Sequence, residues 1–372
     1  MTLFLLCAGG TGGHLFPAEA LAHELGARGH TVHLVTDERA ARYAGEFPAE
    51  ETHVVPSATF GSKHPLKLMR SGLTLFSGYR KAMGLMRSLR PGAVIGFGGY
   101  PTLPPMVAAV RSGLPCIVHE QNAVMGRANK AVAGRVTAIA GGFLRRSGPF
   151  ASKIVEVGNP LRPAVQALAA APYEAPADDG SIRLLVFGGS QGARFFSDMM
   201  PEAVAALPAN LRARLLVTQQ VRAEDQARVE ERYREMGVTA NVAPFFSDLP
   251  ARMAGAHLVV SRSGASTVLE LSVIGRPAIL VPLPHALDDD QGHNAQLLVD
   301  ARAALMRRQP GITPESLAAD IASLFEDRET LPAMAAGAIG VARLNATTAL
   351  ADLAEAVAAG RAAEIINEGT HS

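Results

Sequence analysis

The sequence predicts an α/β protein made of two doubly wound parallel sheets. Short apolar runs that end in glycine-rich turns alternate with helical patterns, which is typical of parallel strands joined by crossover helices. The alternation starts twice, at Leu3 and at Leu184, and a chain of 372 residues is long enough for two domains. We therefore expect two Rossmann-like domains that bind ligands beyond the carboxyl ends of their strands, in a cleft between them.

Apolar periodicity assigns the elements of the first half. Apolar runs too short for a helix are assigned to strands, and stretches with an apolar residue every three or four positions are assigned to helices. The expected strands are Leu3–Ala8, Thr31–Thr36, Ala93–Gly96, Pro115–His119 and Val136–Ala140, and the expected helices are Leu15–Arg28, Pro65–Leu89 and Thr102–Arg111. After Gly158-Asn159-Pro160, the alanine- and proline-rich stretch 167–180 is expected to be a linker.

The same pattern assigns the second half. Its expected strands are Leu184–Phe187, Leu215–Thr218, Val242–Phe245, Leu258–Ser261 and Ala278–Val281, with helices at Ala223–Met236 and Ser266–Ile274. The two halves open alike, with a strand, a glycine turn, a hydroxyl residue and then a helix. This likeness predicts a second Rossmann-like sheet.

The composition fits a globular protein of a reducing compartment. Hydrophobic residues make up 48% and charged residues 19% of the chain, which allows large cores. The formal net charge of +1 gives no general attraction to nucleic acid, which we do not expect as a partner. Cys7 and Cys116 lie in apolar runs and are expected to be buried thiols. No apolar run approaches the roughly 20 residues that span a bilayer, and no basic segment precedes the first strand as in a signal peptide.

The two glycine turns, Gly9–Gly13 and Gly188–Gly192, are candidate phosphate sites. Glycine lets backbone N–H groups approach a phosphate, and the helix that follows supplies partial positive charge. A tight turn without a ligand is the alternative for either one. The dinucleotide fingerprint is met only in part, because Leu15 stands at its third glycine position, although Asp37 could contact a ribose. A nicotinamide-dependent oxidoreductase is therefore kept as a minor alternative.

The run Ser261–Glu270 is a candidate pyrophosphate site in the second half. It follows a predicted buried strand and enters a helix, which gathers hydroxyl groups and N–H groups at the helix start. Glu270 can accept hydrogen bonds from a ribose, although an acid stabilised by the helix dipole is the alternative. The acids 288–290 and Gln291 could contact sugar hydroxyls. We expect no metal or other cofactor there, because helix N-termini already neutralise a pyrophosphate.

Two polar turns and one histidine mark the first half. Gly98-Gly99-Tyr100 follows one predicted strand, and the polar quartet 119–122 follows the next. Both are expected at the same edge of the sheet, although ordinary loop geometry is the alternative. His14 follows a phosphate-type turn and has an ordinary pKa near neutrality, so it is a candidate for proton transfer. On its own, a structural histidine would be the better interpretation.

Together these motifs resemble the MurG family, the UDP-N-acetylglucosamine transferases that complete the lipid-linked disaccharide-pentapeptide of peptidoglycan. The resemblance covers essentially the whole chain. Its carriers are Gly9-Gly10-Thr11-Gly12-Gly13-His14, Gly98-Gly99-Tyr100, His119-Glu120-Gln121-Asn122, Gly158-Asn159-Pro160-Leu161-Arg162, Gly188-Gly189-Ser190-Gln191-Gly192-Ala193, and Arg262-Ser263-Gly264-Ala265 with Glu270. Each motif is weak alone, but six in this order are specific.

The resemblance implies the GT-B fold and an inverting sugar transfer. Residues 1–161 would form an acceptor- and membrane-binding domain and residues 162–340 a UDP-sugar-binding domain. Residues 341–359 would return to the first domain through a helix at Asn345–Ala359. The muramyl C4 hydroxyl of the acceptor would attack the anomeric carbon of N-acetylglucosamine, with His14 as candidate base and UDP as leaving group. The implied location is the cytoplasmic face of the bacterial inner membrane, with other cell-wall synthesis proteins as further partners.

The resemblance also implies the substrate-binding residues. Those expected to hold the UDP-sugar are Arg162, Ser190, Phe246 near the uracil, Ala265, Ser266, Thr267, Val268, Leu269, Glu270 at the ribose, and Gln291 near the sugar. Those expected on the acceptor side are Thr11, Gly12, Gly13 and Asn122, with an acceptor loop of Gly98, Gly99, Tyr100, His119 and Glu120. Many members of the family carry glutamine or histidine where this chain has Asp290, so the sugar contacts there can differ. Another UDP-sugar transferase or an epimerase is the alternative that would share these donor residues.

The segment 60–91 is expected to contact an anionic membrane surface. Its basic residues are Lys63, Lys67, Arg70, Arg80, Lys81, Arg87 and Arg90, and no acid interrupts them. Apolar residues alternate with them, and we expect Leu73, Phe76 and Tyr79 to enter the membrane interface. An amphipathic core helix with a solvated basic face is the alternative.

Overall fold

A computed structural model of the whole chain describes residues 1–9, 12–41, 47–58, 64–169, 171–284 and 287–368. The chain divides into two units. Unit 1 comprises Met1–Pro163 and Arg343–Ser372, and unit 2 comprises Ala164–Ala342. The first boundary thus falls after Pro163 rather than after residue 161, which places Arg162 in unit 1.

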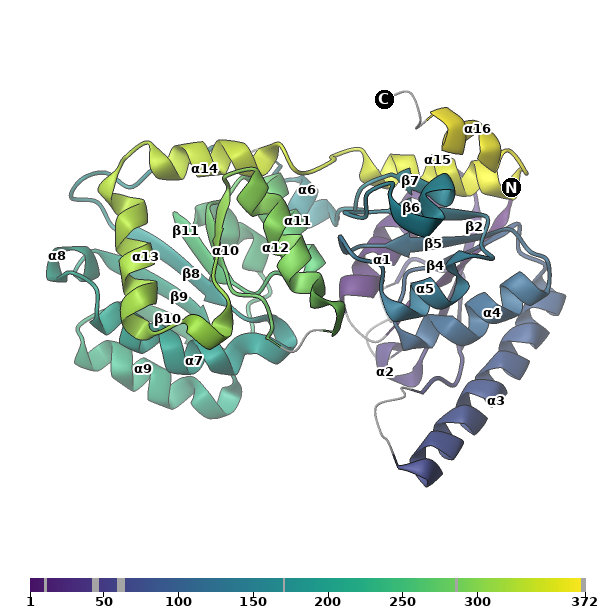
Figure 1. Cartoon of the computed structure of the whole chain (residues 1–372), viewed down its shortest axis with the longest axis horizontal. Helices are drawn as coiled ribbons and strands as arrows, with labels where there is room; N and C mark the ends of the chain where they lie inside the picture. The colour runs from purple at the N-terminus through teal and green to yellow at the C-terminus, as the bar shows by residue number, and fades with distance from the viewer. Residues whose placement is uncertain (10–11, 42–46, 59–63, 170, 285–286, 369–372) are drawn as a thin grey trace. The chain divides into compact units, whose positions relative to one another are not determined.

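Unit 1 is built on a seven-stranded parallel sheet in the order β3-β2-β1-β4-β5-β6-β7 (Figure 1). This order reverses its direction between β1 and β4, which is the arrangement of a Rossmann-like sheet. Its elements, with η for 3₁₀ helices, are β1 (Leu3–Cys7), α1 (Gly12–Ala27), β2 (Thr31–Thr36), α2 (Glu38–Ala41), β3 (Glu51–Val54), α3 (Pro65–Leu89), β4 (Ala93–Gly96), η2 (Tyr100–Thr102), α4 (Leu103–Arg111), β5 (Cys116–Glu120), α5 (Arg127–Ala133), β6 (Ala138–Gly141), η3 (Gly148–Lys153), β7 (Ile154–Glu156), α15 (Ala346–Ala358) and α16 (Ala362–Glu368).

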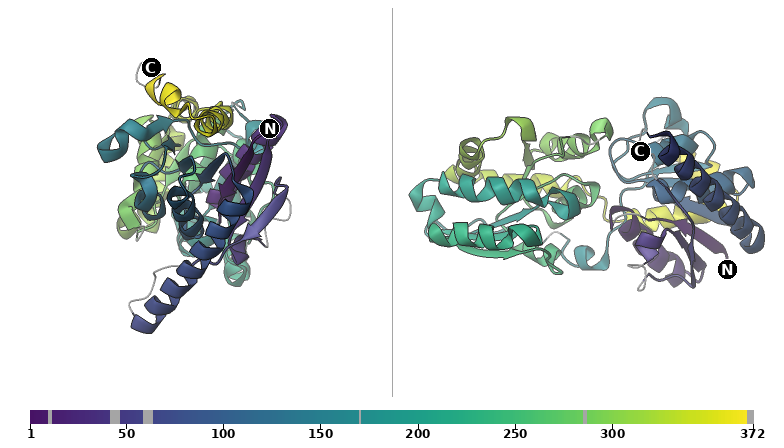
Figure 2. Two further views of the ribbon diagram at one scale, coloured as in Figure 1. Left: turned by 90° about the vertical axis from the view of Figure 1, so that its right-hand side faces the viewer. Right: turned by 90° about the horizontal axis from the view of Figure 1, so that it is seen from below.

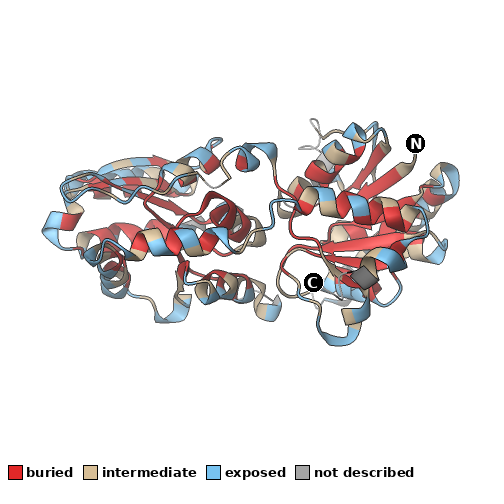
Figure 3. Ribbon diagram, turned by 90° about the horizontal axis from the view of Figure 1, so that it is seen from above, coloured by how far each residue is buried: buried red, intermediate tan, exposed pale blue. Residues whose placement is uncertain are grey.

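The strands of unit 1 are buried on both faces. Along β1, Phe4 and Leu6 point into one core and Leu5 and Cys7 into the other, because successive side chains of a strand alternate between faces. The core of Phe4 is closed by α1 and α15, and that of Leu5 by α3 and α4. Figure 3 shows the result, with continuously buried strands and helices that are buried along one side only. Continuous apolar runs in the sequence follow from this double coverage.

The last helices of the chain belong to unit 1. Helix α15 packs against α1 and against β4, β5 and β6, and its Leu350 and Leu353 are fully buried. Arg28, just after α1, is bound to Asp352 at 2.7 Å and to Glu355 at 2.8 Å. This helix agrees closely with the expected one at 345–359. Helix α16, which lies beside it in Figure 2, was not expected from the sequence.

Unit 2 carries a six-stranded parallel sheet in the order β10-β9-β8-β11-β12-β13. The direction of this order reverses between β8 and β11, as it does between β1 and β4 in unit 1. Its elements are α6 (Pro163–Gln166, at the boundary), β8 (Ile182–Phe187), α7 (Gly189–Ala205), α8 (Ala209–Arg212), β9 (Leu215–Gln220), η4 (Ala223–Asp225), α9 (Gln226–Glu235), β10 (Thr239–Ala243), α10 (Leu249–Gly255), β11 (Leu258–Ser261), α11 (Ala265–Ile274), β12 (Ala278–Leu280), η5 (Leu287–Asp289), α12 (Asp290–Asp300), β13 (Ala304–Met306), η6 (Gln309–Gly311), α13 (Pro314–Glu326) and α14 (Thr330–Ile339).

The edge strands differ most from the expectation. Strand β10 covers Thr239–Ala243 instead of the expected Val242–Phe245, and β3, β7 and β13 were not expected at all. Edge strands are covered less completely than central ones, so they need not be strongly apolar. The sequence of β10, which is Thr-Ala-Asn-Val-Ala, therefore gave little periodic signal.

We predict that Leu353→Ala lowers the free energy of unfolding of unit 1 by about 2–5 kcal/mol, because it leaves a cavity under α15. Urea denaturation followed by circular dichroism measures the change. Leu344→Ala is the matched control, since Leu344 is 51% exposed and its truncation should alter stability by no more than about 0.5 kcal/mol. Equal losses in both variants would contradict the packing of α15 described above.

Candidate active site

The loops after β1 and β4 meet where the strand order of unit 1 reverses. His14 lies in the first turn of α1, and its ring rests on the backbone of Gly98 and Gly99. A Cβ atom at Gly98 would be 3.4 Å from Cε1 of His14, and one at Gly99 would be 3.2 Å from Cδ2. Both glycines have positive φ values, 88° and 79°, which other residues rarely adopt. The glycine turn at 98–99 thus lets the imidazole lie close to the backbone.

The environment of His14 favours its neutral form. The side chain is half-buried, and its Nδ1 is fully buried with no hydrogen-bond partner of ordinary geometry among the described residues. Burial lowers the pKa of His14 below its usual value, although the carboxylate of Glu120 opposes this effect. A neutral imidazole at the reversal of the strand order can accept a proton, and the role of His14 as the base stays a prediction.

A buried network fixes the residues after β5. Nε2 of Gln121 donates to the carbonyl of Phe97 at 2.9 Å and to Nδ1 of His119 at 3.0 Å. Because this amide nitrogen can only donate, Nδ1 of His119 accepts, and its Nε2–H donates to the carbonyl of Gly158 at 3.1 Å. Burial lowers the pKa of His119 to about 4, so the ring is neutral at physiological pH.

Glu120 is a buried acceptor of hydrogen bonds. One carboxylate oxygen accepts from the backbone N–H of Asn122 at 3.1 Å and from its side-chain amide at 3.0 Å. The other accepts from the N–H of Gly126 and from Nδ2 of Asn129, both at 2.9 Å. His119 and Glu120, which the sequence placed in the acceptor loop, are 0% and 2% exposed, so their side chains hold this loop from inside the unit. Asn129 was missed, because one asparagine in a helix carries no local signal of this contact.

The remaining first-unit candidates lie near the start of α1. Gly12 and Gly13 open α1, Tyr100 begins η2 and is half-buried, and Thr11 lies outside the described residues. The guanidinium of Arg162 is 4.2 Å from the ring centre of Phe16 in α1. Arg162 belongs to unit 1 by the division of the chain, and this contact is favourable because a cation is attracted to the face of an aromatic ring. The binding of UDP by Arg162 stays a prediction.

The corresponding position in unit 2 is open at two helix starts. Helix α7 begins at Gly189 after β8, and α11 begins after Gly264, which follows β11. A Cβ atom at Gly189 or at Gly264 would meet no other atom within 4 Å, so both turns border open space. Ser266 and Thr267 are half-buried in the first turn of α11, whereas the side chain of Ser190 is not described. Backbone N–H groups at such starts can bind a phosphate.

Hydrogen bonds tie the start of α12 to the start of α11. Oγ of Ser263 donates to the carbonyl of Gln291 at 2.8 Å, and Nδ2 of Asn294 donates to the carbonyl of Ser263 at 3.3 Å. Oε1 of Gln291 accepts from the N–H of Leu283 at 3.1 Å. The expected sugar-contact residue Gln291 thus also shapes the loop at 283–291. Further along α11, Val268, Leu269 and Glu270 are buried, and Glu270 is 7% exposed.

The buried side chain of Arg262 holds the loop after β12 in place. Its guanidinium donates to the carbonyls of Val281 at 3.0 Å and Pro282 at 3.2 Å, and to Oε1 of Gln309 at 2.7 Å. It also lies 4.9 Å from the ring centre of Phe195. Burial lowers the pKa of Arg262 to about 10, which still leaves it charged at neutral pH. The sequence marked Arg262 as part of a motif but gave no indication of this structural role.

The two phenylalanines after β10 differ in exposure. The side chain of Phe246, expected near a uracil, is 9% exposed, and the guanidinium of Arg252 lies 4.3 Å from its ring centre. Phe245 is instead 74% exposed. The Phe246 side chain is thus covered by Arg252, and its expected place near the uracil stays a prediction. Adjacent residues point in different directions, and the sequence could not indicate which of the two would be covered.

The acidic run at 288–290 is partly paired. Asp289 is bound by both terminal nitrogens of Arg308, at 2.5 and 2.7 Å. Asp290 caps the next N–H at 2.9 Å, and its burial raises the pKa of this carboxyl. These contacts hold the turn before α12.

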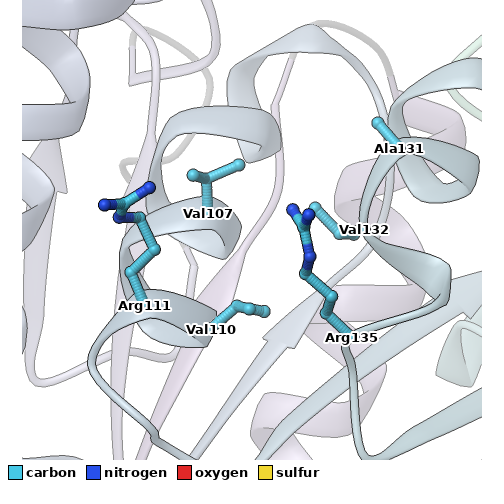
Figure 4. A pocket seen from close by; sticks show the side chains of 6 residues that line it. All are labelled: Val107, Val110, Arg111, Ala131, Val132 and Arg135. Atoms are coloured by element: carbon cyan, nitrogen blue, oxygen red, sulfur yellow. The ribbon is translucent and has the colours of Figure 1, made fainter.

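A separate hollow of about 340 Å³ lies between α4 and α5 (Figure 4). It is lined by Val107, Val110, Arg111, Ala131, Val132 and Arg135. It shares no residue with the candidate site.

Two family models and several solved structures match this chain. The glycosyltransferase family 28 N-terminal domain matches residues 4–141, and the family 28 C-terminal domain matches residues 183–357. A solved structure of Acinetobacter baumannii MurG has a TM-score of 0.77 and 29% identity, covering 95% of this chain and 99% of that one. A kitacinnamycin glycosyltransferase, at 20% identity and a TM-score of 0.72, supports the fold alone.

Relatives of known name are similar over nearly their full length. A UDP-N-acetylglucosamine–N-acetylmuramyl-(pentapeptide) pyrophosphoryl-undecaprenol N-acetylglucosamine transferase of Chelativorans sp. (strain BNC1) is 58% identical, covering 96% of this chain and 95% of the relative. A protein of the same name from Mesorhizobium japonicum is 55% identical, covering 100% and 99%. The α/β class with two doubly wound sheets and the resemblance noted from the sequence are both confirmed. The chain therefore belongs to the MurG family of N-acetylglucosamine transferases.

Proposed function

We propose that this protein transfers N-acetylglucosamine from UDP-N-acetylglucosamine to the C4 hydroxyl of undecaprenyl-pyrophosphoryl-N-acetylmuramyl-pentapeptide. This reaction converts lipid I into lipid II in peptidoglycan synthesis. The observation that carries the proposal is the 58% identity to a named transferase over 96% of the chain. The two glycine turns, one at the strand-order reversal of each sheet, support it.

Unit 2 is proposed to bind the UDP-sugar. The open start of α11 would hold the pyrophosphate, because its N–H groups and helix dipole favour a negative charge that grows as UDP leaves. Glu270, in the same helix, would accept hydrogen bonds from the ribose. Ser190 at the start of α7 and Gln291 at the start of α12 are proposed to contact the phosphate and the sugar.

Unit 1 is proposed to bind the acceptor and to supply the base. The C4 hydroxyl must lose its proton as it attacks the anomeric carbon, and the neutral imidazole of His14 can take it. Gly98, Gly99 and Tyr100 would form the loop around this hydroxyl, with Asn122 beside them. Arg162, which belongs to unit 1, is proposed to stabilise a pyrophosphate with its positive charge.

Helix α3 supports a peripheral membrane contact. Leu66, Met69, Leu73 and Phe76 recur every three or four residues and are 58–65% exposed, so they form one apolar stripe. The N-terminal turns of α3 extend beyond the sheet that it covers (Figures 1 and 2). Tyr79 is instead half-buried against the core, so we exclude it from the proposed membrane contact. Lys63 and the side chain of Lys67 lie outside the described residues.

Basic side chains accompany this stripe. Arg70, Arg80, Lys81, Arg87 and Arg90 are exposed. Each basic residue near an anionic surface contributes roughly 1 kcal/mol of attraction. In the described part of the chain, no helix combines the length and apolar character needed to cross a membrane. We therefore propose binding at the cytoplasmic face of the bacterial inner membrane through this stripe.

Glu270→Ala should weaken binding of UDP-N-acetylglucosamine by roughly 1–3 kcal/mol, because charge-assisted hydrogen bonds to the ribose would be lost. Isothermal titration calorimetry measures the affinity. Glu224→Ala, at an exposed acid of the same unit, is the control and should leave the affinity unchanged. Unaltered affinity in the Glu270 variant would remove the ribose assignment.

His14→Ala should reduce kcat by roughly 10²–10⁴-fold with little change in donor affinity, because it removes the base. As the pH falls through the lowered pKa of His14, the imidazole gains a proton and stops acting as a base. The acid limb of kcat/KM should therefore lie below pH 6.5. His23→Ala, at an exposed position of the same helix, is the control. Turnover near that of the unmodified protein would show that His14 is not the base.

The double variant Leu73→Ser, Phe76→Ser should bind anionic vesicles less tightly and still use a soluble acceptor analogue at the normal rate. Co-sedimentation with vesicles measures the binding. Leu344→Ser, which alters another exposed leucine of unit 1, is the control. If the double variant sediments as completely as the unmodified protein, α3 is not the membrane contact.

A further inference from the structure

Two histidines and a glutamate lie together at the edge of the first sheet. In the parallel pairing of β2 and β3, His33 is opposite Glu51 and Val35 is opposite His53. His33, Glu51 and His53 therefore point to the same face of the sheet, since side chains two residues apart on a strand share a face. The same face carries Val35 and Val55, which pack in the core closed by α3.

Two nitrogen atoms of the histidines are about as far apart as two ligands of one metal ion. Nδ1 of His33 is 3.1 Å from Nε2 of His53. Two imidazole nitrogens on one tetrahedral Zn²⁺ ion, each about 2.0–2.1 Å from the metal, are about 3.3 Å apart. Oε2 of Glu51 is 4.0 Å from Nδ1 of His33, and Oε1 is 3.5 Å from Nδ1 of His53, which is the ring nitrogen other than the one next to His33. One ligand atom from each of the three residues lies within 4.8 Å of the others.

The two histidine side chains are mostly buried, whereas the Glu51 side chain can move in solvent. This combination suits a metal site that is open on its solvent side. His33 and His53 have side chains that are 10% and 9% exposed, and the strands fix their backbones. The Glu51 side chain is 60% exposed and can rotate to complete the site from the solvent side. A hydrogen bond between two neutral histidines, with Glu51 opposite His33 in the strand register, is the alternative that metal titration tests.

We propose that His33, Glu51 and His53 bind a divalent transition-metal ion of the Zn²⁺ class, with water as the remaining ligand. Imidazole nitrogen and carboxylate oxygen are the ligands such ions prefer. The bound ion would tie β3 to β2 and so protect the edge of the sheet, because β3 is its outermost strand in the described part of the chain. The site lies along the strands rather than beyond their carboxyl ends, so it is separate from the proposed sugar transfer.

One neighbouring charge opposes this binding. Lys81 of α3 lies close enough to His53 for their positive charges to repel one another. Removing this charge should therefore strengthen the binding of a cation, whereas a purely structural histidine pair would not respond in this way.

The test uses the full-length protein, freed of metal with a chelator and titrated with Zn²⁺ in competition with a chromophoric chelator. We expect one ion per chain and a higher thermal midpoint when it binds. His33→Ala and His53→Ala should each lower the affinity at least about tenfold. Removing a residue that only hydrogen-bonds to a metal ligand already costs about tenfold or more, and removing the ligand itself should cost no less. Lys81→Gln should bind more tightly, and His23→Ala should bind as the unmodified protein does.

Glu51→Gln keeps the test valid if a histidine variant fails to fold, because its side chain is mostly in solvent. This variant should bind Zn²⁺ more weakly while its midpoint without metal is unchanged. Substitution by Co²⁺ should give the strong visible absorption of a four-coordinate site. The proposal would be overturned if the Glu51, His33 and His53 variants bound Zn²⁺ as tightly as the unmodified protein, or if His23→Ala lost binding.

Discussion

The buried carboxylate of Glu120 is the constraint on which the candidate site of unit 1 depends. A carboxylate that is 2% exposed is stable only when its oxygens are hydrogen-bonded, and here N–H groups of Asn122, Gly126 and Asn129 donate to them. These donors come from the loop after β5 and from the start of α5. Together with the neighbouring His119 and Gln121, they fix the loops after β4 and β5 relative to each other. The backbone on which the ring of His14 rests is held by this network.

In unit 2, the loops at the reversal of strand order are also fixed by a buried charge, but that charge is positive. Arg262 follows β11, next to the reversal of strand order, and donates to carbonyl groups after β12 and to Gln309. In unit 1, an acid gathers N–H groups, and in unit 2, a guanidinium gathers carbonyl groups. Both charges are hydrogen-bonded to groups of the protein itself. The starts of α7 and α11 border open space at Gly189 and Gly264, and N–H groups at such helix starts can bind a phosphate.

Much of the candidate site followed from local signals. A glycine turn between a strand and a helix has one consistent geometry, so Gly98, Gly99, Gly189 and Gly264 lie at the expected edges of the sheets. Which polar residues face a ligand did not follow from such signals. His119 and Glu120 of the expected acceptor loop are buried, and so is the side chain of Phe246, because burial depends on the neighbours that distant segments supply. Tyr79 and Leu73 differ in burial for the same reason. Tyr79 lies on the part of α3 that packs against the core, whereas Leu73 does not.

The sequence by itself determined the fold class, the central strands and the MurG-family resemblance. Each depends on the order of residues along one short segment or on the order of several motifs. Tertiary structure decided what those segments touch. The pairing of Arg28 with Asp352 joins residues 324 positions apart, and the grouping of His33, Glu51 and His53 depends on the register of two strands. No periodicity encodes such contacts, because they arise only when the sheet and its covering helices bring separate segments together.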